Sequence, residues 1–353
     1  MAILTLNLDP LDVLFFRDGQ AFTSGGRAGS GYPTPQTLGG ALRSHLMEAA
    51  GCDFHQFGDD IRSGLTPRDA ARRQSPALEA ALSMRLRGPW LKYDGTIMLP
   101  TPVTVLRVRG GSTLVRLDPS GQPVPGWRDS GEQGLAPLWP RTRARTEAAG
   151  GYLALEAMAD FLAGRTPPTD GLVPANTLFA IEHRTGIAVD STAGTAAEGM
   201  IYGIGFLRLR PGVRFVVEIE TDAGVPPLGD FLLRWGGEGR HVACSVADTP
   251  VQWPGGPALD GSLAVLTTPA FLSGGWHGDD WHPLAVACGE GQAISGWDLA
   301  RRAPKPTRFA VPAGAVFYFA SGRDSVLERT SLSAGDDVAN GFGCFLKGGW
   351  TYA

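Results

Sequence analysis

The stretch AILTLNL at residues 2–8 places leucine at positions 4, 6 and 8, and the stretch TPQTLGGALRSHL follows it at residues 34–46. Alternation with a period of two is typical of a half-buried strand. Thr34 is a suitable N-cap, Pro35 fits the first helical position, and Gly51 is a suitable helix stop. The sequence therefore predicts that the chain begins with a strand followed by a helix.

The rest of the pattern indicates an α+β protein. At 353 residues the chain is longer than one ordinary domain, so we expect two packed units. Short strands and glycine turns dominate after Ile181, and residues 110–151 have the composition of an insertion. Periodicity and turn residues predict helices at 66–83, 152–161 and 228–235, and strands at 103–108, 113–117, 200–209, 213–219, 241–246, 263–267, 284–287 and 315–319. The order strand, strand, helix, strand from 200 to 246 is part of a ferredoxin-like plan.

The composition limits the classes of function. The formal charge is −4, from 31 basic and 35 acidic residues. Indiscriminate nucleic-acid binding depends on a basic surface, so any contact with RNA must be local. No segment has the length and hydrophobicity of a membrane span. The four cysteines show no paired spacing that would indicate a zinc site or a disulfide framework, so we expect a protein of the reducing cytoplasm.

Motifs for catalysis or metal binding are weak. The sequence has no G-x-S-x-G elbow, and residues 343–348 lack the G-K-[ST] ending of a phosphate-binding loop. The segment HGDDWH at 277–282 has side chains that suit a transition metal, but it resembles a loop, and we interpret it as solvated turn residues. His183 is a possible general base for RNA cleavage, yet a structural or RNA-stacking role is preferred because no second acid or base is evident. We predict no catalytic residue, no metal and no cofactor.

Several blocks of sequence resemble one family, the RAMP-superfamily subunit at the 5′ end of the guide RNA in the type III-B (Cmr) CRISPR effector. The blocks are DPLDVLFFRDG at 9–19, YPTP at 32–35, GGALR at 39–43, EHRTGI at 182–187, EGMIY at 198–202, GGEGR at 236–240, TPAF at 268–271, SGWD at 295–298, KP at 305–306, VPAGAV at 311–316 and GFGCFLKGG at 341–349. They occur in the family's order and together cover most of the chain. Residues 52–172 match no motif of the family.

The resemblance implies a fold of two ferredoxin-like (RRM-like, RAMP) domains with helical and hairpin insertions. The first would be residues 1–180, with an insertion at about 52–172, and the second residues 181–353, ending in a glycine-rich loop. The resemblance also implies a non-catalytic subunit that binds the 5′ tag of the guide RNA (crRNA). Its other partners would be the large polymerase-type (palm-domain) subunit and the backbone RAMP subunit, which it bridges, with target RNA met only indirectly and no membrane partner.

The residues expected to bind RNA are basic and glycine residues of these blocks and of the glycine-rich segment near the first helix. They are Arg17, Arg27, Arg43, His183, Arg184, Arg240, Lys305, Gly341, Gly343, Lys347 and Gly348. Glycine-rich backbone presents N–H groups to phosphates, and arginine both binds phosphate and stacks on bases. For any single arginine a surface ion pair is an open alternative, and for the tail glycines a tight connection is another.

Two other classes of function stay open. One is a guide-RNA-processing endoribonuclease of the RAMP superfamily, with His183 as the base. The other is a small-molecule or nucleotide binder that uses the glycine loops, and the sequence leaves open whether a nucleotide binds where this subunit meets the large one.

Overall fold

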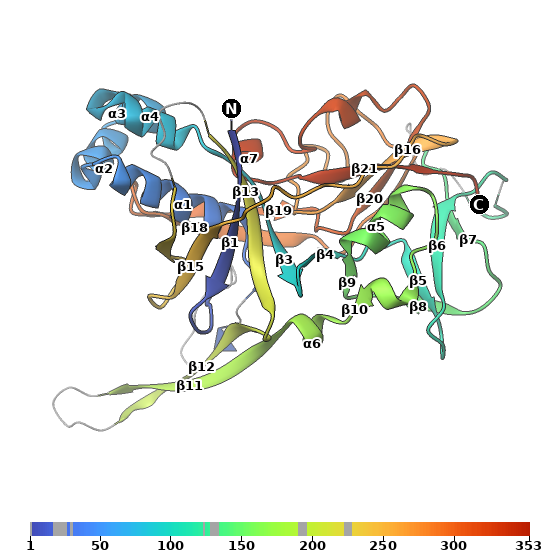
Figure 1. Cartoon of the computed structure of the whole chain (residues 1–353), viewed down its shortest axis with the longest axis horizontal. Coiled ribbons are helices and arrows are strands. Elements are labelled where there is room, and N and C mark those ends of the chain that lie inside the picture. Colours follow the sequence, from blue (N-terminus) through green and yellow to red (C-terminus); the bar gives the residue numbers. More distant parts are fainter. Residues whose placement is uncertain are drawn as a thin grey trace. The chain divides into compact units, whose positions relative to one another are not determined.

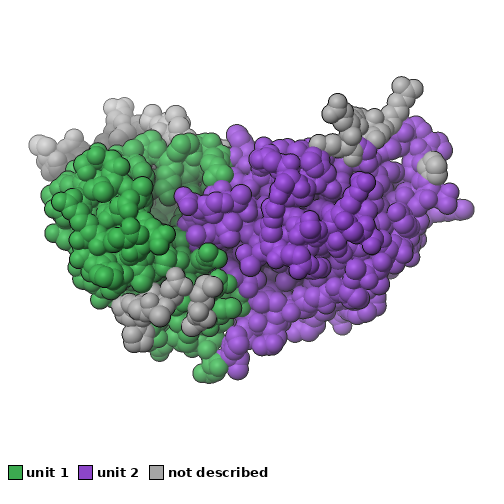
Figure 2. Space-filling view, turned by 90° about the horizontal axis from the view of Figure 1, so that it is seen from above, with its two compact units in different colours: residues 1–85, 178–248, 293–308 green, residues 86–177, 249–292, 309–353 purple. Residues whose placement is uncertain are grey.

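A computed structural model of the chain shows two compact units, each assembled from three separate segments (Figure 2). Unit 1 comprises residues 1–85, 178–248 and 293–308, and unit 2 comprises residues 86–177, 249–292 and 309–353. The structure describes residues 2–16, 27–28, 31–122, 124–127, 134–189, 196–221 and 228–353. Of residues 2, 27–28, 186–189 and 196–202 it describes only the backbone. The chain passes from unit 2 to unit 1 between residues 177 and 178, close to the predicted domain boundary at 180/181. The division into two consecutive domains stays a prediction.

Unit 1 is built on an antiparallel sheet. Its helices are α1 (Pro35–Ala49), α2 (Phe54–Arg62), α3 (Pro67–Gln74) and α4 (Pro76–Leu82). Its strands are β1 (Ala2–Pro10), β2 (Arg27–Ala28), β11 (Phe179–Val189), β12 (Ala196–Leu209), β13 (Val213–Thr221), β14 (Phe231–Arg234) and β15 (His241–Val246), together with most of the hairpin of β18 (Gln292–Asp298) and β19 (Ala303–Ala310). In the sheet, β1 pairs antiparallel with β13 on one side and with β15 on the other, and β14 follows β15.

The predicted strand and helix at the start of the chain are confirmed. Leu6 and Leu8 of β1 are fully buried, as the alternation requires. On α1, Leu38, Leu42 and Leu46 are buried along one side. Thr34 does occupy the N-cap, but its side chain accepts no hydrogen bond from the helix, so the proline that follows it and the buried leucines are the features that define this start.

Gly40, inside α1, is exposed, and a Cβ added there would meet no atom within 4 Å. Replacing Gly40 by alanine is therefore expected to raise the free energy of unfolding by about 0.5–1 kcal/mol, because glycine is a poor helix residue. Urea denaturation of the full chain measures this change. A matched control is Gly236→Ala, where φ is +91° and the new Cβ would stand 2.5 Å from the carbonyl oxygen of Phe15. A destabilised Gly40→Ala variant would contradict the prediction.

The helical stretch predicted at 66–83 is two helices. Thr66 caps α3 as expected, since its hydroxyl accepts from the N–H of Asp69 at 3.2 Å. At Ser75 the backbone is extended, and its hydroxyl accepts from the N–H of Leu78 at 3.3 Å. Pro76 cannot donate to the preceding turn, so the chain ends one helix and begins the next.

The helix predicted at 228–235 is wrong. This segment contains strand β14, which pairs antiparallel with β15. Leu233 is buried while its neighbour Leu232 is 61% exposed, and this is the two-residue period of a strand. The predicted order of strand, strand, helix, strand therefore fails, and two ferredoxin-like domains are not confirmed.

β11 and β12 form a long antiparallel ribbon that extends past the ends of β1 and β13 (Figure 1). Glu182 lies opposite Phe206, and Arg184 lies opposite Ile204. Residues opposite each other share a face, so the ribbon carries these side chains on one face. His183, opposite Gly205, lies on the other face.

Unit 2 contains three runs of paired strands and a few short helices. The runs have the orders β10-β9-β4-β3, β17-β20-β16-β21 and β7-β6-β5-β8. The strands are β3 (Arg85–Tyr93), β4 (Thr96–Pro100), β5 (Val105–Val108), β6 (Leu114–Pro119), β7 (Leu138–Pro140), β8 (Thr146–Ala148), β9 (Tyr152–Ala154), β10 (Leu172–Val173), β16 (Gly261–Leu266), β17 (Ala285–Ala287), β20 (Val316–Ala320) and β21 (Phe345–Trp350). The helices are α5 (Leu155–Leu162), α6 (Ala175–Leu178) and α7 (Asp336–Ala339), with the 3-10 turns η1 (Thr169–Gly171) and η2 (Ser325–Glu328).

The core of unit 2 is aromatic. Trp281 packs edge-on against Phe317, with ring centroids 5.5 Å apart, and both belong to a buried cluster with Phe319 and Leu332. The strands predicted at 103–108 and 113–117 are confirmed as the hairpin of β5 and β6. An α+β chain with mostly antiparallel sheets is thus confirmed. Within the described residues, no helix is long and apolar enough to cross a membrane.

Candidate nucleic-acid interface

Three blocks that are far apart in the sequence meet in unit 1. The segment after β1 bonds to β12, since Leu14 and Leu207 exchange two backbone hydrogen bonds of 2.8 Å. The same segment bonds to the turn between β14 and β15, where the N–H of Gly237 donates to the carbonyl of Phe15 at 2.8 Å. Residues 12–16, the base of the β11–β12 ribbon and residues 236–240 therefore form one surface.

Three arginines and two carboxylates gather on this surface. We call Asp12, Glu182, Arg184, Phe206, Arg208 and Arg240 the arginine cluster. Asp12 is the shared acceptor: its carboxylate oxygens lie 3.1 Å from Arg208, 3.3 Å from Arg240 and 3.7 Å from Arg184. Glu182 accepts from Arg184 at 2.7 Å and also from Arg208. The group has one more positive than negative charge, and its charged side chains are partly exposed.

Phe206 forms the floor of the cluster. The guanidinium carbons of Arg184 and Arg240 lie 5.1 and 4.8 Å from the centroid of its ring. Phe206 is buried and packs against Phe15. Such cation–π contacts hold guanidinium planes in fixed orientations, which suits stacking on bases and binding of phosphate. Nε of Arg240 is buried and has no hydrogen-bond acceptor in the described part of the chain.

The turn at 236–240 positions Arg240 through unusual backbone angles. Gly236 has φ of +91°, and only glycine fits there because a Cβ would strike the carbonyl of Phe15. Glu238 has φ of +58°, a conformation that costs a non-glycine residue energy and is often found at ligand sites. The N–H of Arg240 returns to the carbonyl of Gly237 at 3.3 Å, which closes the turn beside the cluster.

Hydrogen bonds from Arg208 and then Arg184 lower the pKa of Glu182 from 4.5 to about 2. Because the pKa is lower in the folded than in the unfolded chain, ionised Glu182 stabilises the fold above about pH 4.5, and this contribution is lost as the pH falls toward 2. A carbon NMR titration of Glu182 should therefore show a midpoint near 2, and Arg208→Gln should move it back toward 4.5. A midpoint near 4.5 in the wild type would contradict the hydrogen bonding described above.

The other predicted site residues of unit 1 do not join this cluster. Arg43 lies on α1 and donates to the backbone carbonyl of Met84 at 3.0 Å, so it has a structural contact. His183 is exposed on the opposite face of the ribbon. Lys305 is exposed on β19. The backbone of Arg27 in β2 pairs with β12 at Gly203, but its side chain is not described. Arg17 lies outside the described residues.

The predicted glycine-rich loop near the C-terminal end is instead a turn followed by strand β21. Gly341, Gly343 and Gly348 are buried, and a Cβ on them would come within 3.0, 2.5 and 2.6 Å of neighbouring atoms of unit 2. Close packing explains these glycines, so they present no open loop to RNA. Lys347 on β21 is half exposed and pairs with Glu328 at 3.2 Å.

Four residues of the cluster were not predicted from the sequence: Asp12, Glu182, Phe206 and Arg208. Asp12 and Glu182 stood inside blocks that were singled out, but carboxylates were not sought in an RNA site. Phe206 and Arg208 become visible only through the strand register, which places them beside Glu182. A strand predicted at 179–189 and paired with the strand predicted at 200–209 would have placed them beside Glu182.

The segment considered for a metal does not form a ligand set. His277 and His282 stack with ring centroids 4.9 Å apart, and Asp280 pairs with Arg329. In the described part of the chain, no three His, Cys, Asp or Glu side chains are grouped as metal ligands. The absence of a metal and of a catalytic residue stays a prediction.

Comparisons with known proteins agree on one family. The family described as CRISPR-associated protein (Cas_Cmr3) matches residues 6–350. A chain in the cryo-EM structure of the Type III-B Cmr-beta bound to cognate target RNA and AMPPnP is 16% identical, with a TM-score of 0.54, covering 89% of this chain and 86% of that one. A chain in the Type III-B Cmr-beta bound to cognate target RNA is 17% identical, with a TM-score of 0.53 and the same coverage. No curated protein matches the sequence.

The family match covers nearly the whole chain, and the fold is that of chains found in Cmr-beta complexes. The blocks that meet at the arginine cluster lie within the matched residues. The chain therefore belongs to the Cas_Cmr3 family of CRISPR-associated proteins.

Proposed function

We propose that this chain is a RAMP-like subunit of a type III-B (Cmr) effector, that it holds the repeat-derived 5′ tag of the guide RNA there, and that it catalyses no reaction itself. The observation that carries the proposal is the arginine cluster of unit 1. It holds two guanidinium groups over one aromatic ring and a third beside them, with only two carboxylates. The proposal includes the bridging role between the large polymerase-type subunit and the backbone subunit, and a fold of two ferredoxin-like domains, residues 1–180 and 181–353.

The chemistry of the cluster suits single-stranded RNA. Each guanidinium uses part of its edge for Asp12 or Glu182 and keeps further N–H donors for phosphate oxygens. The net charge of the chain is −4, and the cluster adds only one positive charge in excess. We therefore expect weak RNA binding by the isolated chain and strong binding once a neighbouring subunit supplies the other wall of the groove.

Ultraviolet cross-linking of a tagged guide RNA in the assembled complex tests where the tag lies. Cross-linked peptides are identified by mass spectrometry. We expect tag nucleotides to be joined to peptides that contain residues 182–184, 206–208 or 236–240. Cross-links from these peptides only to the spacer part of the guide would contradict the proposal.

The non-catalytic part of the proposal has its own test. Purified chain is incubated with repeat RNA and compared with a His183→Ala variant. We expect intact RNA in both samples. Cleavage that disappears in His183→Ala would instead support the endoribonuclease alternative.

The bridging role is tested by co-purification. The tagged large subunit and the backbone subunit are each expressed with and without this chain. We expect the large subunit to retain the backbone subunit only when this chain is present. Equal retention without it would contradict the bridge.

A further inference from the structure

The hairpin of β18 and β19 is held against the helices of unit 1. Its two strands form a sheet of their own, with no third strand among the described residues. Nε2 of Gln36 on α1 donates to the carbonyl of Ser295 at 2.6 Å, and Figure 1 shows β18 beside α1. Nη1 of Arg62 on α2 donates to the carbonyl of Ala300, in the turn of the hairpin, at 2.6 Å. These bonds fix both the strand and the turn.

The structure explains most of the SGWD block at 295–298, but not its tryptophan. The serine supplies the carbonyl that α1 binds. A Cβ on Gly296 would stand 3.3 Å from Nε2 of Gln36, and Asp298 accepts a backbone N–H of the following turn at 3.0 Å. Trp297 is 58% exposed, and no hydrogen bond or ring contact joins it to another described residue. The fold of this chain therefore gives Trp297 no partner among those residues.

The solvent side of the hairpin is apolar at its end. Side chains alternate along a strand. Ile294 is 3% exposed and Gly296 lies against α1, so these even-numbered positions face the helices. Trp297 is on the other face, and Leu299, which directly follows the strand, is 80% exposed. An indole and an aliphatic side chain thus project into solvent from backbone that is already fixed.

The outer edge of β19 is unsuited to a further strand. Pro304 and Pro306 lack an N–H group, and residues two apart in an antiparallel strand direct their N–H groups to the same edge. Their place in the strand keeps the ladder to β18 intact and leaves the outer edge without two donors. A partner would therefore meet side chains of the hairpin and not its backbone.

The hairpin is basic in a chain that is acidic as a whole. Residues 292–308 include four basic residues and one acidic residue. The acidic residue, Asp298, pairs with Arg301 at 3.0 Å. Arg302 and Lys305 are exposed, and neither forms an ion pair with another described residue. The charge complementary to this hairpin is therefore negative.

We propose that the hairpin tip, defined as Trp297, Leu299, Arg301 and Arg302, docks into an apolar pocket rimmed by carboxylates on another protein chain of the effector. The inference rests on the proposed function only in that the chain is a subunit of such a complex. Tryptophan and arginine are enriched among the residues that dominate protein interfaces. Leu299 offers no surface for stacking on a base, and Asp298 already holds Arg301, so the tip suits a protein pocket better than RNA.

Affinity measurements with each of the other purified subunits, without RNA, test the hairpin tip. The variant Trp297→Ser/Leu299→Ser should weaken association with one of them at least about 30-fold, because anchors of this kind dominate an interface. The variant Arg302→Gln/Lys305→Gln should lower the association rate at low salt and make it less dependent on salt. Unchanged association of Trp297→Ser/Leu299→Ser with every subunit would overturn the proposal.

A matched control removes exposed apolar side chains elsewhere in unit 1. Ile3 and Leu232 are 50% and 61% exposed, so Ile3→Ser/Leu232→Ser should leave the association nearly unchanged. An equal loss in this control would overturn the proposal. Wild-type protein gives a test without any variant: hydroxyl-radical oxidation of Trp297 should slow when the chain joins the other subunits without RNA. The same rate before and after assembly would also overturn it.

RNA as the occupant is distinguished in the same variants. If Trp297→Ser/Leu299→Ser joins the other subunits normally but loses affinity for guide or target RNA, the proposal is overturned in favour of RNA. The proposed function is tested by Arg184→Gln/Arg240→Gln, which should lose the tag and still join the other subunits. The two proposals can therefore fail separately.

Discussion

Replacing Arg116 by alanine is expected to lower the free energy of unfolding by about 3–5 kcal/mol, because it leaves a buried carboxylate without its partner. Arg116 and Asp118 are both buried on β6, with Nε 2.7 Å from the carboxylate oxygen. The same guanidinium donates to the backbone carbonyls of Phe161 and Gly349 at 2.5 and 3.1 Å. One side chain thus joins β6, α5 and β21 within unit 2, and urea denaturation of the full chain measures its contribution.

The loss of unfolding free energy in Arg116→Ala should depend on pH, and the direction of this dependence identifies its cause. Burial raises the pKa of Asp118, and the charge and hydrogen bond of Arg116 oppose that rise. Without Arg116 the pKa rises further, so the folded state binds a proton more readily than the unfolded state. The variant should therefore be less destabilised at low pH than at neutral pH.

The control for this prediction is Arg165→Ala, which removes an arginine that is 63% exposed and pairs with Asp160. Exposed pairs contribute at most about 1 kcal/mol, so this variant should remain close to the wild type. An equally small loss of unfolding free energy in Arg116→Ala would contradict the claim that buried Arg116 stabilises unit 2.

The double variant Arg184→Gln/Arg240→Gln is expected to weaken capture of tagged guide RNA by the assembled complex by roughly 25-fold at about 0.1 M salt. Glutamine keeps a donor near Asp12 but loses the charge and the contact over Phe206. The slope of log K against log salt should fall by about 1.4, since each lost phosphate contact is worth about 0.7. Filter binding over a series of salt concentrations measures both quantities.

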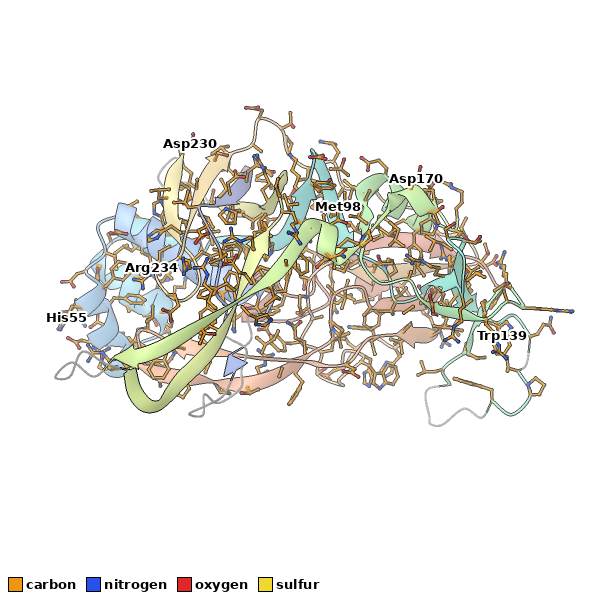
Figure 3. All side chains as sticks on the ribbon, turned by 90° about the horizontal axis from the view of Figure 1, so that it is seen from below. His55, Met98, Trp139, Asp170, Asp230 and Arg234 are labelled. Carbon is orange, nitrogen blue, oxygen red and sulfur yellow. The ribbon has the colours of Figure 1, made fainter. Side chains whose placement is uncertain are left out.

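A matched control for this variant is available in unit 1. Arg214 is partly exposed and pairs with Asp9 at 3.3 Å, and Arg234 is exposed on β14 (Figure 3). Arg214→Gln/Arg234→Gln removes the same charge away from the arginine cluster. An equal loss of guide capture in this control would show that the cluster is not the site.

Local sequence patterns were sufficient to predict the first strand and the first helix. The alternation of β1 and the helical spacing on α1 depend on burial of one face, and such periods are visible in one segment of sequence. Pro76 is also visible in the sequence, but a single helical stretch was predicted at 66–83, where this proline begins a second helix. The strand β14 was missed because its pairing with β15 overrides the helical preference of its leucines.

The candidate site depends on contacts between distant segments, which a single sequence does not reveal. Arg184 and Arg240 were predicted from blocks of sequence, but their common acceptor Asp12 lies more than a hundred residues away. For Gly341 and Gly348 the sequence could not distinguish an open loop from close packing, because both require a residue without a side chain. Burial is decided by the segments that pack against them.

The most direct test of the central claim is a cycle of four affinities. The assembled complex, with wild-type chain or with Arg184→Gln/Arg240→Gln, is titrated with guide RNA that carries or lacks its 5′ tag. We predict that removal of the tag weakens binding to the wild-type complex at least tenfold, an effect of about 1.4 kcal/mol or more, and hardly changes binding to the variant. An equal loss in both complexes would contradict the claim that the arginine cluster holds the tag.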